Sequence, residues 1–249
     1  MCGSVNLLLM EHSADMNAAI WRSEEIVRTW TAEAEKHERN RAAQRRFMAV
    51  LLPFAEQEEF TFLDLGAGTG AASRAILGLH PRSNAILADF STQMMAAGER
   101  EMEPFAGRYR HVEFDMTTGE WPAAIPAALD AVVTSMCVHH LTDERKQGLF
   151  AEIFDHLVPG GWYLNYDPVG AEDPVVEATW QRVSDHDNPE AAGKRHHRTA
   201  EEQARFDNHV RYIIPLPQQL EYLQSAGFRG IDVYWKQLEN VIYGGYRPA

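Results

Sequence analysis

The sequence predicts an α/β fold, in which helices cover both faces of a mostly parallel sheet. Two observations predict this class. A short apolar strand runs into a glycine-rich turn at residues 62–70, and a strand followed by a helix recurs four times along the chain. A length of 249 residues fits one such domain with a lid over it, so we expect a single core.

The first elements in chain order are helices. Between residues 16 and 46 the chain has no glycine, and its apolar residues recur near helical spacing. We therefore expect N-terminal cap helices in residues 1–50 and the main domain in residues 51–249. Four apolar residues predict a helix end that packs on the sheet: Phe47, Val50, Leu51 and Phe54. Four basic residues nearby are interpreted as a solvated helix face: Arg39, Arg41, Arg45 and Arg46.

The glycine turn indicates a ligand. Asp64, Gly66, Gly68 and Gly70 form a D-x-G-x-G-x-G pattern, in which glycines let the backbone turn tightly and let a ligand approach the main chain. The third glycine comes one residue earlier than in the G-x-G-x-x-G pattern of dinucleotide-binding proteins. An acid ahead of the turn suits a ligand with a positive amine better than a pyrophosphate.

After the turn, helix and strand patterns alternate to the end of the chain. Pro81 ends the first helix, Ser91 and Thr142 suit the N-caps of the next two, and Gly227 suits the end of the last. After the strand that leads into the glycine turn, strands are predicted at residues 84–90, 109–114 and 129–136. The fifth strand follows the turn at 157–162, and the last two lie at residues 231–236 and 241–246. Residues 169–214 are long, polar and rich in histidine. Structureless loops of this length are uncommon in compact domains, so this segment is predicted to form a helical lid.

Five landmarks, in this order, resemble the motifs of the class I S-adenosylmethionine-dependent methyltransferases of the small-molecule type. They are the glycine turn, the strand ends at Asp89 and Asp115, the apolar strand 129–136 and the turn at 157–162. The resemblance covers about residues 51–247. It implies a Rossmann-like, seven-stranded, mostly parallel sheet with an antiparallel last strand, N-terminal helices and a helical lid inserted after strand 5.

The same resemblance implies a cofactor, S-adenosyl-L-methionine, which leaves as S-adenosyl-L-homocysteine. Asp64 would receive the amine of this cofactor, Asp89 both ribose hydroxyls, and Asp115 the amino group of the adenine. The expected cofactor-binding residues are Asp64, Gly66, Ala67, Gly68, Asp89, Phe90, Met94, Asp115, Met116 and Met136.

The candidate catalytic residue is a histidine. Methyl transfer from a sulfonium is an in-line displacement, so the protein mainly has to align the acceptor and exclude water. A hydroxyl or a carbon acid also benefits from a positioned base. His139 follows the fourth strand, beside the expected methyl group, and is predicted to be that base. The expected substrate-binding residues are His140, Tyr166, Trp180, His197 and Tyr243.

The pair His139-His140 has other interpretations as well. Both side chains could be structural or could pack on the cofactor. A metal would need a third protein ligand from the lid, which offers His186, His197 and His209. No metal is expected, because a His-His-Leu run is frequent at this place in the family without being a metal site.

The composition disfavours several other functions. With 23 basic and 36 acidic residues the net charge is −13, which disfavours nucleic-acid binding. No stretch approaches the ~20 consecutive apolar residues of a membrane helix, and Cys2 and Cys137 alone make no disulfide framework. We expect a cytoplasmic monomer or homodimer that methylates an O, N, S or C nucleophile of a small molecule. Two alternatives stay open: a noncatalytic S-adenosylmethionine-binding module, and a metal-assisted C-methyltransferase of an α-keto acid.

Overall fold

A computed structural model describes residues 21–249, in which seven strands form one sheet in the order β3-β2-β1-β4-β5-β7-β6. The strands are β1 (Thr61–Leu65), β2 (Asn84–Asp89), β3 (Tyr109–Glu113), β4 (Leu129–Ser135), β5 (Leu157–Pro168), β6 (Arg229–Gln237) and β7 (Asn240–Tyr246). Neighbours pair in parallel from β3 to β5, whereas β7 pairs antiparallel with both β5 and β6. The predicted fold class is confirmed.

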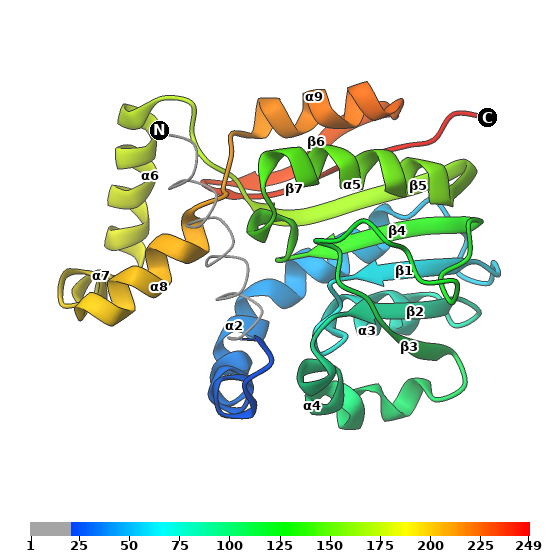
Figure 1. The fold of residues 1–249 in the computed structure, drawn as a ribbon, viewed down its shortest axis with the longest axis horizontal. Helices are drawn as coiled ribbons and strands as arrows, with labels where there is room; N and C mark the ends of the chain where they lie inside the picture. Colours follow the sequence, from blue (N-terminus) through cyan, green and yellow to red (C-terminus); the bar gives the residue numbers. More distant parts are fainter. Residues whose placement is uncertain (1–20) are drawn as a thin grey trace, which may run out of the picture.

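Helices cover both faces of this sheet (Figure 1). One face carries α2 (Glu24–Leu51), α3 (Ala71–Leu79) and α4 (Thr92–Met102), and the other carries α5 (Asp143–His156) and α9 (Leu216–Ala226). Because successive side chains of a strand point to opposite faces, Phe62 lies in one core cluster with Ile76 of α3, while Leu63 lies in the other with Leu149 of α5.

The predicted helix ends are confirmed. Ser91 Oγ accepts a hydrogen bond from the backbone N–H of Met94 at 3.1 Å and so caps α4. Thr142 caps α5 in the same way, through a 3.3 Å bond from the backbone N–H of Arg145. Gly227 ends α9 with a φ of 108°, a conformation that glycine adopts without strain.

The helix α2 corrects one sequence interpretation in part. Phe47 and Val50, expected to pack on the sheet, are 37% and 57% exposed, whereas Met48 and Ala49 are buried. The reason is the helical period of 3.6 residues, which puts residues 41, 45, 48, 49 and 52 on one inward stripe. Leu51 and Phe54 pack against the core as expected, and the helix is a single element to Leu51. The first twenty residues of the predicted cap lie outside the described part of the chain.

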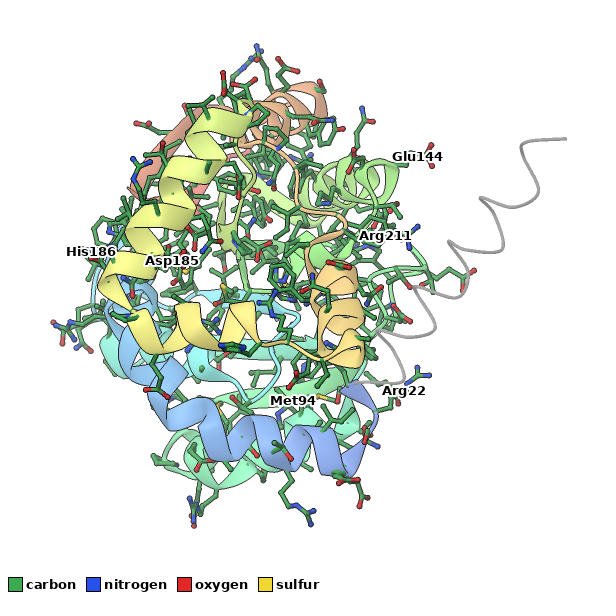
Figure 2. The ribbon with its side chains drawn as sticks, turned by 90° about the vertical axis from the view of Figure 1, so that its left-hand side faces the viewer. Arg22, Met94, Glu144, Asp185, His186 and Arg211 are labelled. Atoms are coloured by element: carbon green, nitrogen blue, oxygen red, sulfur yellow. The ribbon has the colours of Figure 1, made fainter. Side chains whose placement is uncertain are left out.

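The predicted lid consists of three helices, α6 (Pro174–Asp187), α7 (Pro189–His196) and α8 (Ala200–Val210). Its two stems meet at the sheet, because Gly170 N–H donates to Ile214 O at 3.0 Å. The buried Lys146 of α5 fastens the second stem, since its Nζ donates to the carbonyl oxygens of Leu141 and Tyr212. In Figure 2 the three helices, coloured yellow to orange, lie above α2, which is blue. Within residues 21–249, no helix has the length and apolarity needed to cross a membrane.

Candidate functional site

A cavity of about 930 Å³, its open mouth included, lies at the carboxyl ends of β1, β2 and β4. In a parallel sheet of this type, ligands bind outside the carboxyl ends of the strands, where the strand order reverses. All ten residues predicted to bind the cofactor line this cavity: Asp64, Gly66, Ala67, Gly68, Asp89, Phe90, Met94, Asp115, Met116 and Met136.

The glycine turn is held open by its backbone. Gly66 and Gly68 have φ angles of 73° and 54°, in the left-handed region that favours glycine. The N–H groups of Gly66 and Ala67 both donate to Ala88 O, at 2.8 and 3.1 Å. A Cβ on Gly66 would lie 2.7 Å from the Cβ and Sγ of Cys137, so no side chain fits between the turn and the start of the η2 segment (Val138–His140).

Asp64 is buried at the end of β1 with one oxygen in use. Its Oδ2 accepts from the N–H and hydroxyl of Ser73, at 3.0 and 2.7 Å. Its Oδ1 has no hydrogen-bond partner among the described residues. Burial raises the pKa of this carboxyl, offset in part by the bonds from Ser73 and by the charge of Arg45. A buried oxygen without a partner is costly, and a ligand that brings a cationic donor into the cavity would satisfy it.

Asp89 is the last residue of β2 and accepts a hydrogen bond from the glycine turn. Its Oδ2 accepts from Gly68 N–H at 2.7 Å and its Oδ1 from Ser91 N–H at 2.8 Å. Burial raises the pKa of Asp89 to about 6, although both backbone bonds favour the ionised form. Each carboxylate oxygen can accept a further bond, so Asp89 can receive two hydroxyls from a ligand.

The far end of the cavity is formed by the loop after β3. Asp115 accepts from the N–H and hydroxyl of Thr117 at 2.9 and 2.6 Å, both through Oδ1. The adjoining backbone is fixed by Arg145, whose Nε donates to Met116 O at 2.6 Å. Since both bonds from Thr117 go to Oδ1, Oδ2 of the half-buried Asp115 can accept a hydrogen bond from the amino group of a flat ring.

Two arginines in the cavity wall were not predicted. Arg41 and Arg45 line the cavity, and Arg45 is 6% exposed with its Nε bonded to Ser135 Oγ at 3.4 Å. The interpretation of this cluster as a solvated face is therefore wrong for both, while Arg46 is exposed as expected. The signal was present in the sequence, since Arg41 and Arg45 share the inward stripe of α2 with Met48.

Met136 has strained backbone at the cavity. Its φ is 62°, which is uncommon for a residue other than glycine. The N–H of Met136 donates to Tyr166 O at 2.8 Å, and this bond holds the turn from β4 into η2. Strain of this kind persists where the surroundings over-determine it, and it concentrates at binding sites.

The structure brings three histidines together beside the cavity. His139 is buried, with its Nδ1 2.6 Å from Asp167 Oδ1 and its backbone N–H bonded to Asp167 Oδ2 at 2.7 Å. His140 lines the cavity, and its ring centroid is 4.0 Å from that of His139. His209 of α8 completes the group, with centroid distances of 4.9 Å to His139 and 5.1 Å to His140. His139 itself is absent from the cavity wall.

Most residues expected to bind substrate lie elsewhere. Tyr243 is buried in the core, bonded to Asn165 and Gln219, and Tyr166 is buried against Trp235. Trp180 stacks with the Lys236 ammonium at 4.2 Å. His197 is exposed, in the segment between α7 and α8. Of this group, only His140 reaches the cavity.

Part of the chain is similar to known methyltransferases. Residues 63–163 match a family model described as a methyltransferase domain. Uncharacterized methyltransferases of Bacillus cereus and Bacillus mycoides are each 29% identical to the chain over 132 residues, 48% of this chain. The match covers 54% of the length of these relatives, so it spans about half of each.

Several solved structures share the fold. Human N-acetylserotonin methyltransferase in complex with S-adenosylmethionine has a TM-score of 0.62 at 17% identity, over 93% of this chain and 58% of that one. An O-methyltransferase family protein from Burkholderia thailandensis has a TM-score of 0.62 at 17% identity, over 98% and 70%. A family 2 O-methyltransferase from Planctomyces limnophilus in complex with apigenin has a TM-score of 0.64 at 17% identity, over 90% and 61%.

Proposed function

We propose that this chain, which carries a class I S-adenosylmethionine-dependent methyltransferase domain, transfers the methyl group of S-adenosylmethionine to a small-molecule acceptor. The observation that supports this most is the unpartnered Oδ1 of Asp64, buried in a cavity that Arg45 also lines. An amino acid end has one ammonium and one carboxylate. Asp64 would bind the ammonium and Arg45 the carboxylate, each as a charge-assisted hydrogen bond.

The remaining cavity fits the nucleoside. Asp89 would accept the two ribose hydroxyls. The glycine turn leaves room for the sugar because Gly66 and Gly68 have no side chains. Phe90 and Met94 offer apolar walls for a purine, and Asp115 an acceptor for its amino group. Bound S-adenosylmethionine would supply a methyl group on a positively charged sulfur. This sulfur is a good leaving group, because it becomes a neutral thioether when the methyl group is transferred.

The residues around the methyl group would mainly position the acceptor. They hold the acceptor in line with the methyl carbon and keep water out, because a good leaving group needs little further activation. When the new bond to the acceptor forms, the carbon–sulfur bond breaks and the acceptor loses a proton. His139 is a candidate to take that proton, since Asp167 holds its Nδ1 and leaves its Nε2 without a partner among the described residues.

Two features support a small acceptor. The lid helices α6, α7 and α8 lie on the same side of the molecule as the start of α2 (Figure 2), and α8 contacts η2, whose His140 lines the cavity, so the lid can enclose a small acceptor. The net charge of −13 also repels polyanions. An oxygen acceptor agrees with the names of two solved structures of like fold, the O-methyltransferase family proteins from Burkholderia thailandensis and Planctomyces limnophilus.

The first test measures binding and turnover separately. We expect the purified chain to bind S-adenosylmethionine in a calorimeter, and Asp89→Ala to weaken this affinity at least tenfold, because two hydroxyl partners are lost. Glu113→Ala is a matched control, since Glu113 is an exposed acid at the end of neighbouring β3 and does not line the cavity. Equal affinity of Asp89→Ala and wild type contradicts the site. Binding without S-adenosylhomocysteine production across a panel of phenols, amines, thiols and keto acids supports the noncatalytic alternative.

Acid should weaken cofactor binding. An ionised Asp89 accepts hydroxyl bonds better than a neutral one, so binding favours the charged form. Because the pKa of Asp89 is raised to about 6, against an ordinary 3.8, affinity is full above that pH and decreases below it. At about pH 5 we expect roughly tenfold weaker binding than at neutral pH. Asp89→Asn should reduce the pH dependence of the affinity. A wild-type dissociation constant that stays constant between about pH 5 and neutral pH would refute this prediction.

A further inference from the structure

The three histidines converge on one point. Each offers a ring nitrogen, and the three atoms lie within 4.8 Å of one another, the one such group of His, Cys, Asp or Glu found in the described residues. A tetrahedral metal with bonds of ~2.0–2.1 Å needs nitrogens about 3.3 Å apart. His209 is exposed on α8, so a modest side-chain rotation can close the difference.

The environment of His139 is that of a metal ligand. Its side chain is 1% exposed, and its Nε2 has no hydrogen-bond partner among residues 21–249, so one buried lone pair faces the group unused. Its other nitrogen, Nδ1, lies 2.6 Å from Asp167 Oδ1, and a second Asp167 oxygen holds its backbone N–H. A carboxylate behind a histidine fixes the tautomer and the orientation of the ring, as it does behind metal-bound histidines.

We propose that His139, His140 and His209 bind one divalent transition-metal ion at the junction of η2 and α8. Three imidazoles suit Zn²⁺, Fe²⁺, Co²⁺ or Ni²⁺, whereas Mg²⁺ and Ca²⁺ prefer oxygen ligands. Three protein ligands leave a coordination position for another molecule. Since His140 lines the cavity, an acceptor oxygen can reach this position, where the ion would act as a Lewis acid.

The site links two parts of the fold that are distant in sequence. His139 and His140 belong to η2, directly after β4, whereas His209 comes from the last turn of the lid helix α8. An ion bound here would therefore fasten the lid to the body of the domain. With the ion in place the lone pair of His139 is committed to it, so the base role described above applies to the metal-free protein.

The test is a metal titration of the full chain after chelator treatment. We expect one equivalent of Co²⁺ to bind with the visible absorption of a tetrahedral site, and His209→Ala to weaken this affinity at least 100-fold. His186→Ala is the matched control, because His186 is an exposed lid histidine outside the group, on α6 at the edge of the molecule (Figure 2). His186→Ala should bind Co²⁺ like the wild type.

The outcomes decide the assignment without any measurement of turnover. Absence of Co²⁺ and Zn²⁺ binding at micromolar concentrations overturns it, as does equal affinity in His209→Ala and wild type. Asp167→Asn should weaken Co²⁺ binding by ~10–100-fold, the usual effect of removing a partner behind a ligand. Calorimetry with S-adenosylmethionine on the same samples tests the proposed function separately, because the three histidines are not expected to hold the cofactor.

Discussion

Gly66→Ala should weaken S-adenosylmethionine binding by at least 100-fold and lower the free energy of unfolding by about 2–4 kcal/mol. The reasons are a φ of 73° and crowding, since the new Cβ would lie 2.7 Å from Cys137 and 2.9 Å from Met116 Cε. The turn must then move, and it carries the Gly68 N–H that braces Asp89. Calorimetry and thermal unfolding measure both effects, with an expected decrease in melting temperature of about 5–15 °C.

Gly107→Ala separates strain from crowding. Gly107 has a φ of 83°, but a Cβ there meets no described atom within 4 Å. This variant should lose only the ~1–2 kcal/mol of the left-handed backbone and keep the wild-type cofactor affinity. Equal losses of stability and affinity in the two variants would show that the contact with Cys137 is unimportant.

Asp167→Asn should lower turnover at least 100-fold while the affinity for S-adenosylmethionine changes by less than about threefold. Both oxygens of the buried Asp167 accept bonds, one from the ring and one from the backbone of His139. An amide has one acceptor oxygen, so its NH₂ group would face a donor. Breaking a buried pair of this kind costs ~3–5 kcal/mol of stability, and His139 would lose its orientation.

A double-mutant cycle locates this effect. His139→Ala in the Asp167→Asn background should add little to the loss of turnover, because the two residues act as one unit. Asp130→Asn is the matched control: Asp130 Oδ2 accepts one bond, from Thr61 N–H at 2.7 Å, and an amide oxygen can replace it. Additive losses in the cycle, or unchanged turnover in Asp167→Asn, would remove the pair from the mechanism.

That Asp64, Asp89 and Asp115 lie together at one cavity could be predicted because the signals are local. Asp64 and Asp89 lie at the ends of their strands and Asp115 just after its strand, and parallel strands end at one edge, so their order along the chain already places them together. The caps at Ser91 and Thr142 are equally local, because a cap bonds to a backbone N–H three residues on. These elements needed no knowledge of distant contacts.

The acceptor side could not be predicted in the same way. Whether His209, rather than His186 or His197, approaches His139 depends on how three lid helices fold back after β5. The buried Lys146 contributes to that path through its bond to Tyr212 O, which lies 66 residues further along the chain. Gly98 was overlooked as well, although a Cβ there would meet Thr69 O at 2.3 Å, which sets how closely α4 approaches the turn.

The sequence by itself determined the parallel sheet, the glycine turn and the three carboxylates around the cavity, since strand periodicity and turn chemistry act over a few residues. Only the tertiary structure decided that Arg45 faces the cavity, that Tyr243 belongs to the core, and that His139, His140 and His209 meet. The physical reason is that burial and long-range contact depend on the summed packing of all elements. The residue pattern of a single segment does not contain the information on how all the elements pack together.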